Sequence, residues 1–235
     1  MIRSPLLEAV PGVVHGFSTR AHLVPPPPPE FSQPGQLADA LEALGVPGAP
    51  VAMLNQVHGA VVHVAETAGP HWPVGPGDAL VCTERGLVIY VRVADCTPVL
   101  LAGPRGVAAI HAGWRGTVAG VVQAAAEQLM ARSGMRPEEL RGAVGPSIGP
   151  CCYEVGPEVV EGLGRHAPAE VFLHARVAGQ RPTVDVAAVN LHVLRSLGIP
   201  AERLSACTSC DERFHSWRRD GVTAGRQAAL IGLAP

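Results

Sequence analysis

Six short runs of β-forming residues follow one another between Val51 and Ala112, and they constrain the fold more than any other feature of the chain. The runs read VAML, AVVHVA, DALVC, GLVIYVRVA, PVLLAG and GVAAIHA, and glycine, proline or acidic residues mark the breaks between them. Apolar runs of this length that are rich in valine and bounded by such residues are typical of strands. The sequence therefore predicts a sheet over this region.

Helical periodicity begins only after these runs. Apolar residues recur at helical spacing between Val118 and Leu129, which predicts an amphipathic helix over 117–132, and a second helix is predicted over 186–197. A further strand is expected over 203–208, and the ending AGRQAALIGLA fits either a helix or a strand. Strands and helices without strict alternation favour an α+β fold rather than a doubly wound sheet.

Composition narrows the class of protein. The chain has 235 residues, 47% apolar and 16% charged, with a net charge of -2, which leaves no basic surface for nucleic acid or anionic lipid. No apolar run reaches the roughly 18 residues of a membrane span. Six cysteines are too few for a disulfide scaffold, and Glu8 and Pro11 stand where a signal peptide needs apolar residues. We expect a cytoplasmic protein, monomeric by default, that acts on a small molecule.

Two biases in residue usage bear on function. All 18 basic residues are arginine, which excludes a P-loop lysine and a Schiff-base lysine. The arginine guanidinium can still bind phosphate with two parallel hydrogen bonds. The segment HLVPPPPPEFSQPGQ, residues 22–36, is expected to be an exposed loop, because a proline run favours an extended chain without internal hydrogen bonds.

Three residue types suited to metal binding stand at the ends of predicted strands. They are His58 in NQVHGA, Cys96 in VADCTP and His111 in IHAGWRGT. Catalytic zinc usually takes three ligands from separated elements and keeps a fourth position open, so the wide spacing is compatible with such a site. The same residues also fit ordinary hydrogen-bonding histidines and a small buried thiol, or a Cys96 nucleophile activated by His111.

Four other segments hold groups that could bind a substrate or a metal. HAGWRGTVAG offers Arg115 at a helix entry, a local anion site, and RFHSWRRDG is either a solvated basic turn or a substrate clamp. In GPSIGPCCYEVG the adjacent Cys151 and Cys152 would point apart on an extended chain, so we do not expect them to bind one metal together, and the segment is predicted to be a packed turn. Cys207 and Cys210 in CTSC have zinc-knuckle or redox spacing, but we expect neither role without a second such pair.

Seven segments taken together resemble one family. HGFSTR, NQVHG, DALVC, ADCTPVLL, HAGWRGT, GPSIGPCCYEV and FHSWRRDGVTAGR follow in order from His15 to about Ile231, and they are similar to the YfiH family, once called the multicopper polyphenol oxidase or laccase-domain family. The resemblance implies one layered α/β/β/α domain over 1–235. It also implies a purine nucleoside phosphorylase that acts on adenosine, inosine and methylthioadenosine, with adenosine deaminase activity.

The resemblance also implies roles for residues. Zinc would be held by His58, Cys96 and His111. Copper is the less favoured metal, because a copper phenol oxidase needs several copper ions and more closely spaced histidines than can be assigned in the sequence. The chain departs from the family where TRAHLVPPPPP follows the GF segment and where His215 replaces an aromatic residue.

The same motifs also indicate which residues contact the substrate. Cys96, His111 and Arg115 are expected to be catalytic, and the residues expected to contact phosphate or nucleoside are Arg20, Ser147, Arg218 and Arg219. Asp95 is expected to accept a ring N–H and so fix a histidine tautomer, unless it is a strand-end acid that faces water. A cysteine hydrolase or deamidase that uses Cys96 and His111 remains the alternative enzyme.

Overall fold

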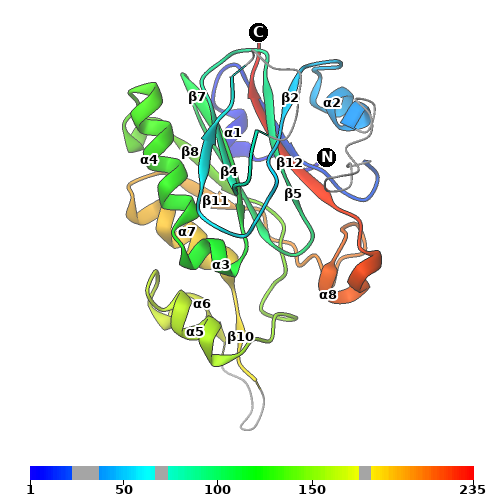
Figure 1. Ribbon diagram of the computed structural model, residues 1–235, viewed down its shortest axis with the longest axis vertical. Helices are drawn as coiled ribbons and strands as arrows, with labels where there is room; N and C mark the ends of the chain where they lie inside the picture. The colour runs from blue at the N-terminus through cyan, green and yellow to red at the C-terminus, as the bar shows by residue number, and fades with distance from the viewer. Residues whose placement is uncertain (23–36, 67–73, 175–180) are drawn as a thin grey trace.

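Two β-sheets stacked face to face form the centre of the molecule (Figure 1). The computed structural model describes residues 1–22, 37–66, 74–174 and 181–235. The four-stranded sheet has the order β1 (Val13–Phe17), β12 (Gln227–Leu233), β5 (Val88–Val93) and β2 (Val51–Ala52). The six-stranded sheet has the order β11 (Ala201–Arg203), β8 (Arg141–Val144), β6 (Thr97–Gly103), β7 (Gly106–Ala112), β4 (Ala79–Cys82) and β3 (Val62–Val64).

The central strands are buried on both faces, which explains why they read as unbroken apolar runs. Every residue of β5, β6, β7 and β12 is buried. One core lies between the sheets, where Leu100 and Ala109 of the six-stranded sheet share a cluster with Ile89 and Ile231 of the four-stranded one. A strand with helices or a second sheet on each side has no solvent face, so alternation of apolar and polar residues disappears.

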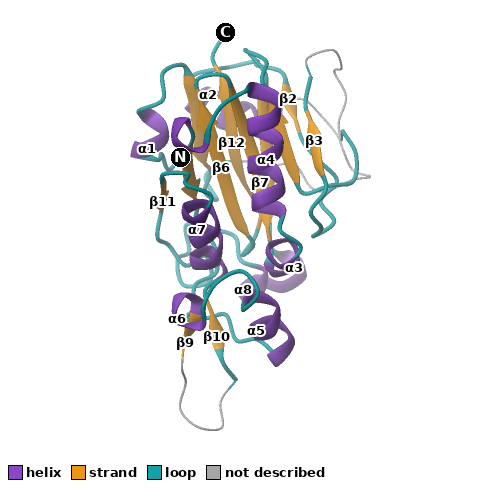
Figure 2. Cartoon of the chain, turned by 90° about the vertical axis from the view of Figure 1, so that its left-hand side faces the viewer, coloured by secondary structure: helices purple, strands orange, loops and turns teal. Residues whose placement is uncertain are grey.

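Helices cover the two outer faces. Figure 2 shows α4 (Val121–Ser133) and α7 (Val186–Ser196) across the six-stranded sheet, where Leu129 and Leu194 pack in one cluster with Val99 and Ile110. On the opposite side α2 (Ala38–Leu44) packs against the four-stranded sheet in a cluster that includes Tyr90. The layers run helix, sheet, sheet, helix, and the predicted α+β class with α/β/β/α layering is confirmed.

A smaller cluster extends the domain below α7 in Figure 1, around the buried Phe172. It contains α5 (Pro157–Leu163), α6 (Ala169–Phe172) and the hairpin of β9 (Leu173–His174) with β10 (Thr183–Val184). The remaining short elements are α1 (Pro5–Glu8), α3 (Trp114–Val118), the 3-10 turn η2 (Pro137–Glu139), α8 (Trp217–Asp220) and the 3-10 turn η3 (Gly221–Thr223). No helix in the described part of the chain is both long and apolar enough to cross a membrane.

The structure corrects two predicted elements. The helix expected over 117–132 is two helices, α3 and α4, because Gly120 has φ 82 between them, a left-handed conformation that ends one helix and begins another. The strand expected over 203–208 ends at Arg203, since its partner β8 ends at Val144 and Pro146 follows shortly after.

The other predicted elements agree with the structure or lie outside it. The six runs between Val51 and Ala112 each contain a strand, and α7 occupies the second predicted helix. The ambiguous C-terminal segment is the strand β12. Of the proline-rich segment 22–36, residues 23–36 are not among the described residues.

A buried histidine in β1 predicts that the fold loses stability in mild acid. His15 is 1% exposed and accepts the backbone N–H of Ser4 at 2.9 Å. Burial, reinforced by the charge of Arg3, lowers the pKa of His15 from 6.5 to about 4. Between these values only the unfolded chain takes up the proton, so the free energy of unfolding should fall by about 3 kcal/mol as pH drops through this window.

Urea unfolding between pH 6.5 and 4 measures this loss. His15→Gln keeps an acceptor for Ser4 and removes the titration, so its free energy of unfolding should depend less on pH than that of the wild type. An equal pH dependence in both proteins would show that His15 titrates normally.

Candidate metal and substrate site

The β6–β7 hairpin brings Cys96 and His111 together. Their strands are antiparallel, and Pro98 pairs with His111, so Cys96, which immediately precedes β6, lies at the same sheet edge as the end of β7. Gly113 lies opposite, and a Cβ there would stand 2.9 Å from the Cys96 Sγ and 3.2 Å from the His58 Cδ2. A glycine at 113 is therefore required for the thiol to reach its neighbours.

His58 completes a group of three from the loop between β2 and β3. Its ring centroid lies 4.8 Å from that of His111, with the rings at 77°. One ligand atom of each of His58, Cys96 and His111 lies within 4.8 Å of the others. We call these three residues the metal triad.

Two non-glycine residues at this site have left-handed backbones. His58 has φ 62, and Asp95, directly before Cys96, has φ 82; they are the only such residues in the described part of the chain. This conformation is costly for residues with a Cβ, and it is found at functional sites where surrounding contacts hold it. The two left-handed positions therefore orient two members of the metal triad: His58 itself, and Cys96, which follows Asp95.

Asp78, next to the start of β4, holds two members of the metal triad in place. It is fully buried, and its carboxylate accepts the backbone N–H groups of His58 at 2.9 Å and Gly59 at 2.6 Å. It also bonds His111 Nδ1 at 2.8 Å. Burial alone would raise the pKa of Asp78, but the bonds from His111 and the backbone outweigh it and lower the pKa. An ionised carboxylate only accepts, so Nδ1 carries a proton, and Nε2 is the nitrogen that can bind a metal once it has lost its own proton.

This arrangement corrects the role predicted for Asp95. The Asp95 carboxylate accepts the Thr208 hydroxyl and the backbone N–H of Arg218, each at 2.6 Å, and the bond to His111 belongs to Asp78. The only sequence signal for Asp78 is its position at the start of the DALVC run. That position does not distinguish it from other acidic residues as the partner of His111.

The thiol and imidazole of the hairpin favour their charged forms. Burial raises the pKa of Cys96, but the charge of His111 and hydrogen bonds to both histidines outweigh it, and the pKa falls to about 6. Burial lowers the pKa of His111, but Cys96 and Asp78 outweigh it, and the pKa rises to about 9. At neutral pH the thiol is an anion, which is the form that binds a metal and also the form that attacks as a nucleophile.

The donor set of the metal triad fits a catalytic metal. Two imidazoles and one thiolate converge from separate elements, and the acceptor on His111 Nδ1 leaves Nε2 to bind. Three protein ligands with an imidazole oriented by a carboxylate are characteristic of catalytic zinc. The three residues suit zinc by donor type and by number.

A cavity of about 550 Å³ opens over the metal triad. Its lining is strongly positive, because four arginines face a single carboxylate, and it is partly aromatic. The charged residues are Arg92, Arg115, Arg218, Arg226 and Asp95, and the aromatic ones are Trp114, Tyr153 and Trp217. The Arg115 guanidinium lies 4.4 Å from the centre of the Trp114 ring, and that of Arg218 lies 5.1 Å from the centre of the Tyr153 ring. Such a cavity can hold an anion beside a flat ring system.

The predicted substrate residues divide into two groups. Arg115 and Arg218 line the cavity, and their contact with substrate stays a prediction. Arg20, Ser147 and Arg219 lie outside the lining residues. Arg20 bonds Asp220 at 2.5 Å, and Arg219 bonds Thr208 O at 3.0 Å. Ser147 is buried, and its backbone forms an isolated parallel β-bridge with Cys207. Because these three residues do not line the cavity, the geometry favours a supporting role over substrate contact.

Comparison with known proteins agrees with this architecture. A purine nucleoside phosphorylase of Deinococcus radiodurans is 37% identical over 246 residues, covering 99% of this chain and 92% of its own length. Adenosine deaminase RL5, from an unknown prokaryotic organism, is 38% identical over 156 residues, covering 63% of this chain and 59% of its own. The crystal structure of YlmD from Geobacillus stearothermophilus has a TM-score of 0.83 at 28% identity, covering 99% of this chain and 94% of its own.

A family model places the chain among these proteins. The model described as multi-copper polyphenol oxidoreductase laccase matches residues 36–234, which include every strand except β1. This agrees with the resemblance found from the seven sequence segments. The chain belongs to the multi-copper polyphenol oxidoreductase laccase family, the family also known by the name YfiH.

Proposed function

We propose that the protein is a zinc-dependent purine nucleoside phosphorylase. It would cleave adenosine, inosine and methylthioadenosine with phosphate, giving the free base and ribose 1-phosphate or its methylthio form, and it would also deaminate adenosine. The observation that carries the proposal is the meeting of the metal triad with four arginines in one cavity of about 550 Å³. Relatives that are named purine nucleoside phosphorylase and adenosine deaminase support it.

The arginines would supply the phosphate site. Phosphorolysis brings a phosphate oxygen to C1′ of the ribose as the bond to the purine nitrogen breaks, and the sugar passes through a positively charged state. Arg115 and Arg218 stand on the cavity wall with their guanidinium groups stacked on Trp114 and Tyr153. Guanidinium forks bind phosphate oxygens in pairs, so two of them would hold the nucleophile and fix its direction of attack.

Aromatic residues of the same wall would hold the base. Trp217 is half exposed, although it is one of the largest apolar side chains in the protein, and it faces the cavity with Tyr153. A purine ring stacked on such a side chain would bury apolar area on both partners. This stacking would place the glycosidic bond between the arginines and the metal triad.

His58, Cys96 and His111 would hold the zinc ion, with Asp78 fixing the proton on His111 Nδ1. When bound, zinc supplies Lewis acidity, which polarises a substrate oxygen or nitrogen and acidifies water. The chain's own contribution is to keep the thiol ionised and to hold His111 in position through Asp78.

The ionised thiol favours a second candidate, a cysteine hydrolase or deamidase. A pKa of about 6 for Cys96 beside a charged His111 describes a thiolate–imidazolium pair. That enzyme would be active without metal and would be inactivated by alkylation of Cys96 in the metal-free protein. A copper phenol oxidase has less support. Among the described residues, the groups of side chains that could hold a metal contain only two histidines, His58 and His111.

The phosphate dependence of purine release tests the proposal. The Arg115→Ala variant tests in addition whether the cavity arginines bind the phosphate. Arg115→Ala removes one guanidinium from the cavity wall, and a charge-assisted hydrogen bond contributes about 1.5–3 kcal/mol. We expect the KM for phosphate to rise roughly 10- to 100-fold, with a smaller change in the KM for adenosine. The measurement is adenine release against phosphate concentration.

Arg132→Ala is the matched control. Arg132 lies on α4 and pairs with Glu66 at 3.2 Å, away from the cavity lining, so its kinetics should match the wild type. Adenine release that does not depend on phosphate in any of the three proteins would reject phosphorolysis.

A further inference from the structure

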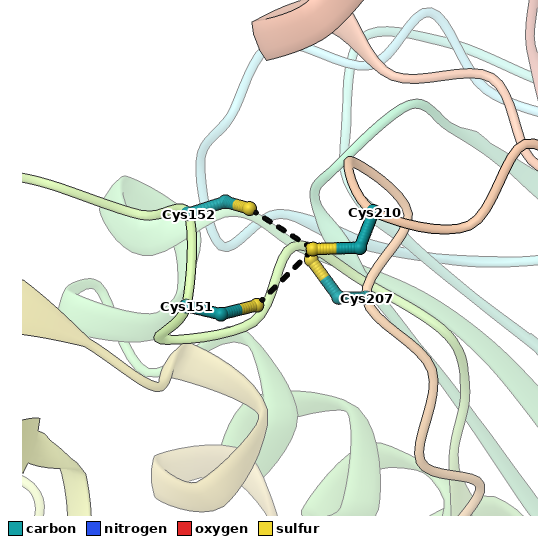
Figure 3. A group of neighbouring side chains, drawn as sticks. All are labelled: Cys151, Cys152, Cys207 and Cys210. Atoms are coloured by element: carbon teal, nitrogen blue, oxygen red, sulfur yellow. Dashed lines mark hydrogen bonds between the residues drawn. The ribbon is translucent and has the colours of Figure 1, made fainter.

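Four cysteines outside the metal triad come together in a partly exposed group (Figure 3). Cys151 and Cys152 come from the loop after β8, and Cys207 and Cys210 from the loop after β11. Their sulfur atoms all lie within 4.8 Å of one another. We call them the cysteine cluster. The adjacent cysteines do not point apart, and the expectation that CTSC lacks a partner pair is wrong.

The backbone explains how adjacent cysteines can share a site. Side chains alternate only on an extended chain, whereas here the amides of Cys152 and Tyr153 both bond Gly149 O at 3.0 Å and so form a tight turn. The second loop turns in the same way, with the amides of Cys210 and Asp211 on Cys207 O. A parallel bridge between Ser147 and Cys207 sets the two turns side by side.

We propose that the cysteine cluster binds a structural zinc ion, a second metal site that is independent of the metal triad. Four thiols would each release a proton to solvent and bind the ion as thiolates. Tetrahedral zinc bound at about 2.3 Å separates its sulfurs by about 3.8 Å. The Cys210 Sγ lies 3.5 Å from that of Cys151 and 3.2 Å from that of Cys152, so little movement is needed. A disulfide would need about 2.0 Å.

The surroundings of the cysteine cluster suit thiolates. The amide of Gly149 donates to Cys207 Sγ at 3.2 Å, and a Cβ on Gly149 would lie 3.4 Å from the Cys151 Sγ, so glycine keeps the space beside the sulfurs clear. Zinc with four thiolates carries two negative charges. Arg218 bonds the carbonyl of Cys152 at 3.0 Å, and Arg219 bonds that of Ser209 at 3.2 Å, which places two cations on the loops.

The proposed ion would fasten the loop that carries Tyr153, which lines the cavity, to the loop that leads into α8. Tyr153 follows Cys152 directly and lines the cavity with Arg218. With four protein ligands and no open position, the ion would be structural and would take no part in the chemistry.

Zinc content of the full-length chain, purified under reducing conditions, tests the proposal. We expect about two zinc ions per chain in the wild type and in Ser209→Ala, a control in the same turn. We expect about one in Cys96→Ala and about one in the double variant Cys207→Ser/Cys210→Ser. Two ions retained in the double variant would overturn the second site. Zinc lost from the double variant but not from Cys96→Ala would support the second site while rejecting zinc at the metal triad.

The identity of the ligands can be read from Cys96→Ala, where the cysteine cluster is the remaining site. X-ray absorption should find four sulfurs at about 2.3 Å, and replacement by cobalt should give the intense visible bands of a tetrahedral thiolate site. Iron in place of zinc, a disulfide detected by mass, or nitrogen and oxygen ligands would each overturn the proposal. Cys210→His keeps four ligands, so it should retain zinc with shifted cobalt bands even if the double variant fails to fold.

Discussion

Cys96→Ala should release the zinc of the metal triad and lower kcat/KM for adenosine phosphorolysis by roughly a thousandfold or more. Cys96 contributes the one anionic ligand of the triad, and metal-ion catalysis is worth several kcal/mol of barrier lowering. Zinc content and adenine release, measured on the same preparation, give the two readouts. The free energy of unfolding serves as a check that the variant is folded.

Cys82→Ala is the matched control for Cys96→Ala. Cys82 is fully buried in β4 and belongs to the core between the sheets, where it acts as a small apolar side chain. This variant should lose a little stability and keep its zinc and its activity. If Cys96→Ala kept its zinc and lost turnover, the thiol would be a nucleophile and the cysteine hydrolase would become the better account.

Asp78→Asn should weaken zinc binding at the metal triad by about 10- to 100-fold. The carboxylate accepts bonds from three backbone amides and from His111, and an asparagine can present only one oxygen to these four donors. Competition with a chelator measures the affinity, and kcat at saturating zinc shows how far the misplaced imidazoles lower turnover.

Asp95→Asn is the informative comparison. Its carboxylate binds Thr208 and the amide of Arg218, so this variant should hold zinc within a few-fold of the wild type. An effect on zinc affinity as large as that of Asp78→Asn would mean that Asp95 orients the metal triad after all.

The layered fold could be predicted largely from local patterns, because fully buried strands have a strong signal. The runs that become β5, β6 and β7 are apolar except for Arg92 in β5, Thr97 in β6 and His111 in β7, and they agree with the structure. Helix ends were harder to predict. Thr117 looked like a helix start, but the left-handed Gly120 separates α3 from α4, and a glycine that ends one helix resembles one tolerated inside a longer one.

The metal triad could be proposed from the sequence because each of its residues stands in a motif that resembles the family, close to a glycine or proline that marks a turn. The groups that depend on long-range pairing could not. Asp78 meets His111 through the register of β4 with β7, and the cysteine cluster forms through the bridge of Ser147 with Cys207. Neither pairing can be predicted from local composition. For this reason the sequence did not identify Asp78, and it indicated two unrelated pairs of cysteines instead of one group of four.

The most direct test of the proposed function is the product analysis of adenosine incubated with the zinc-loaded protein, with and without phosphate. Phosphorus NMR and chromatography would identify the products. The proposal predicts that, when phosphate is present, ribose 1-phosphate equals the sum of adenine and hypoxanthine, because the inosine formed by deamination is also cleaved. When phosphate is absent it predicts inosine and no free base. Adenine released at the same rate without phosphate, or no release of base at all, would contradict it.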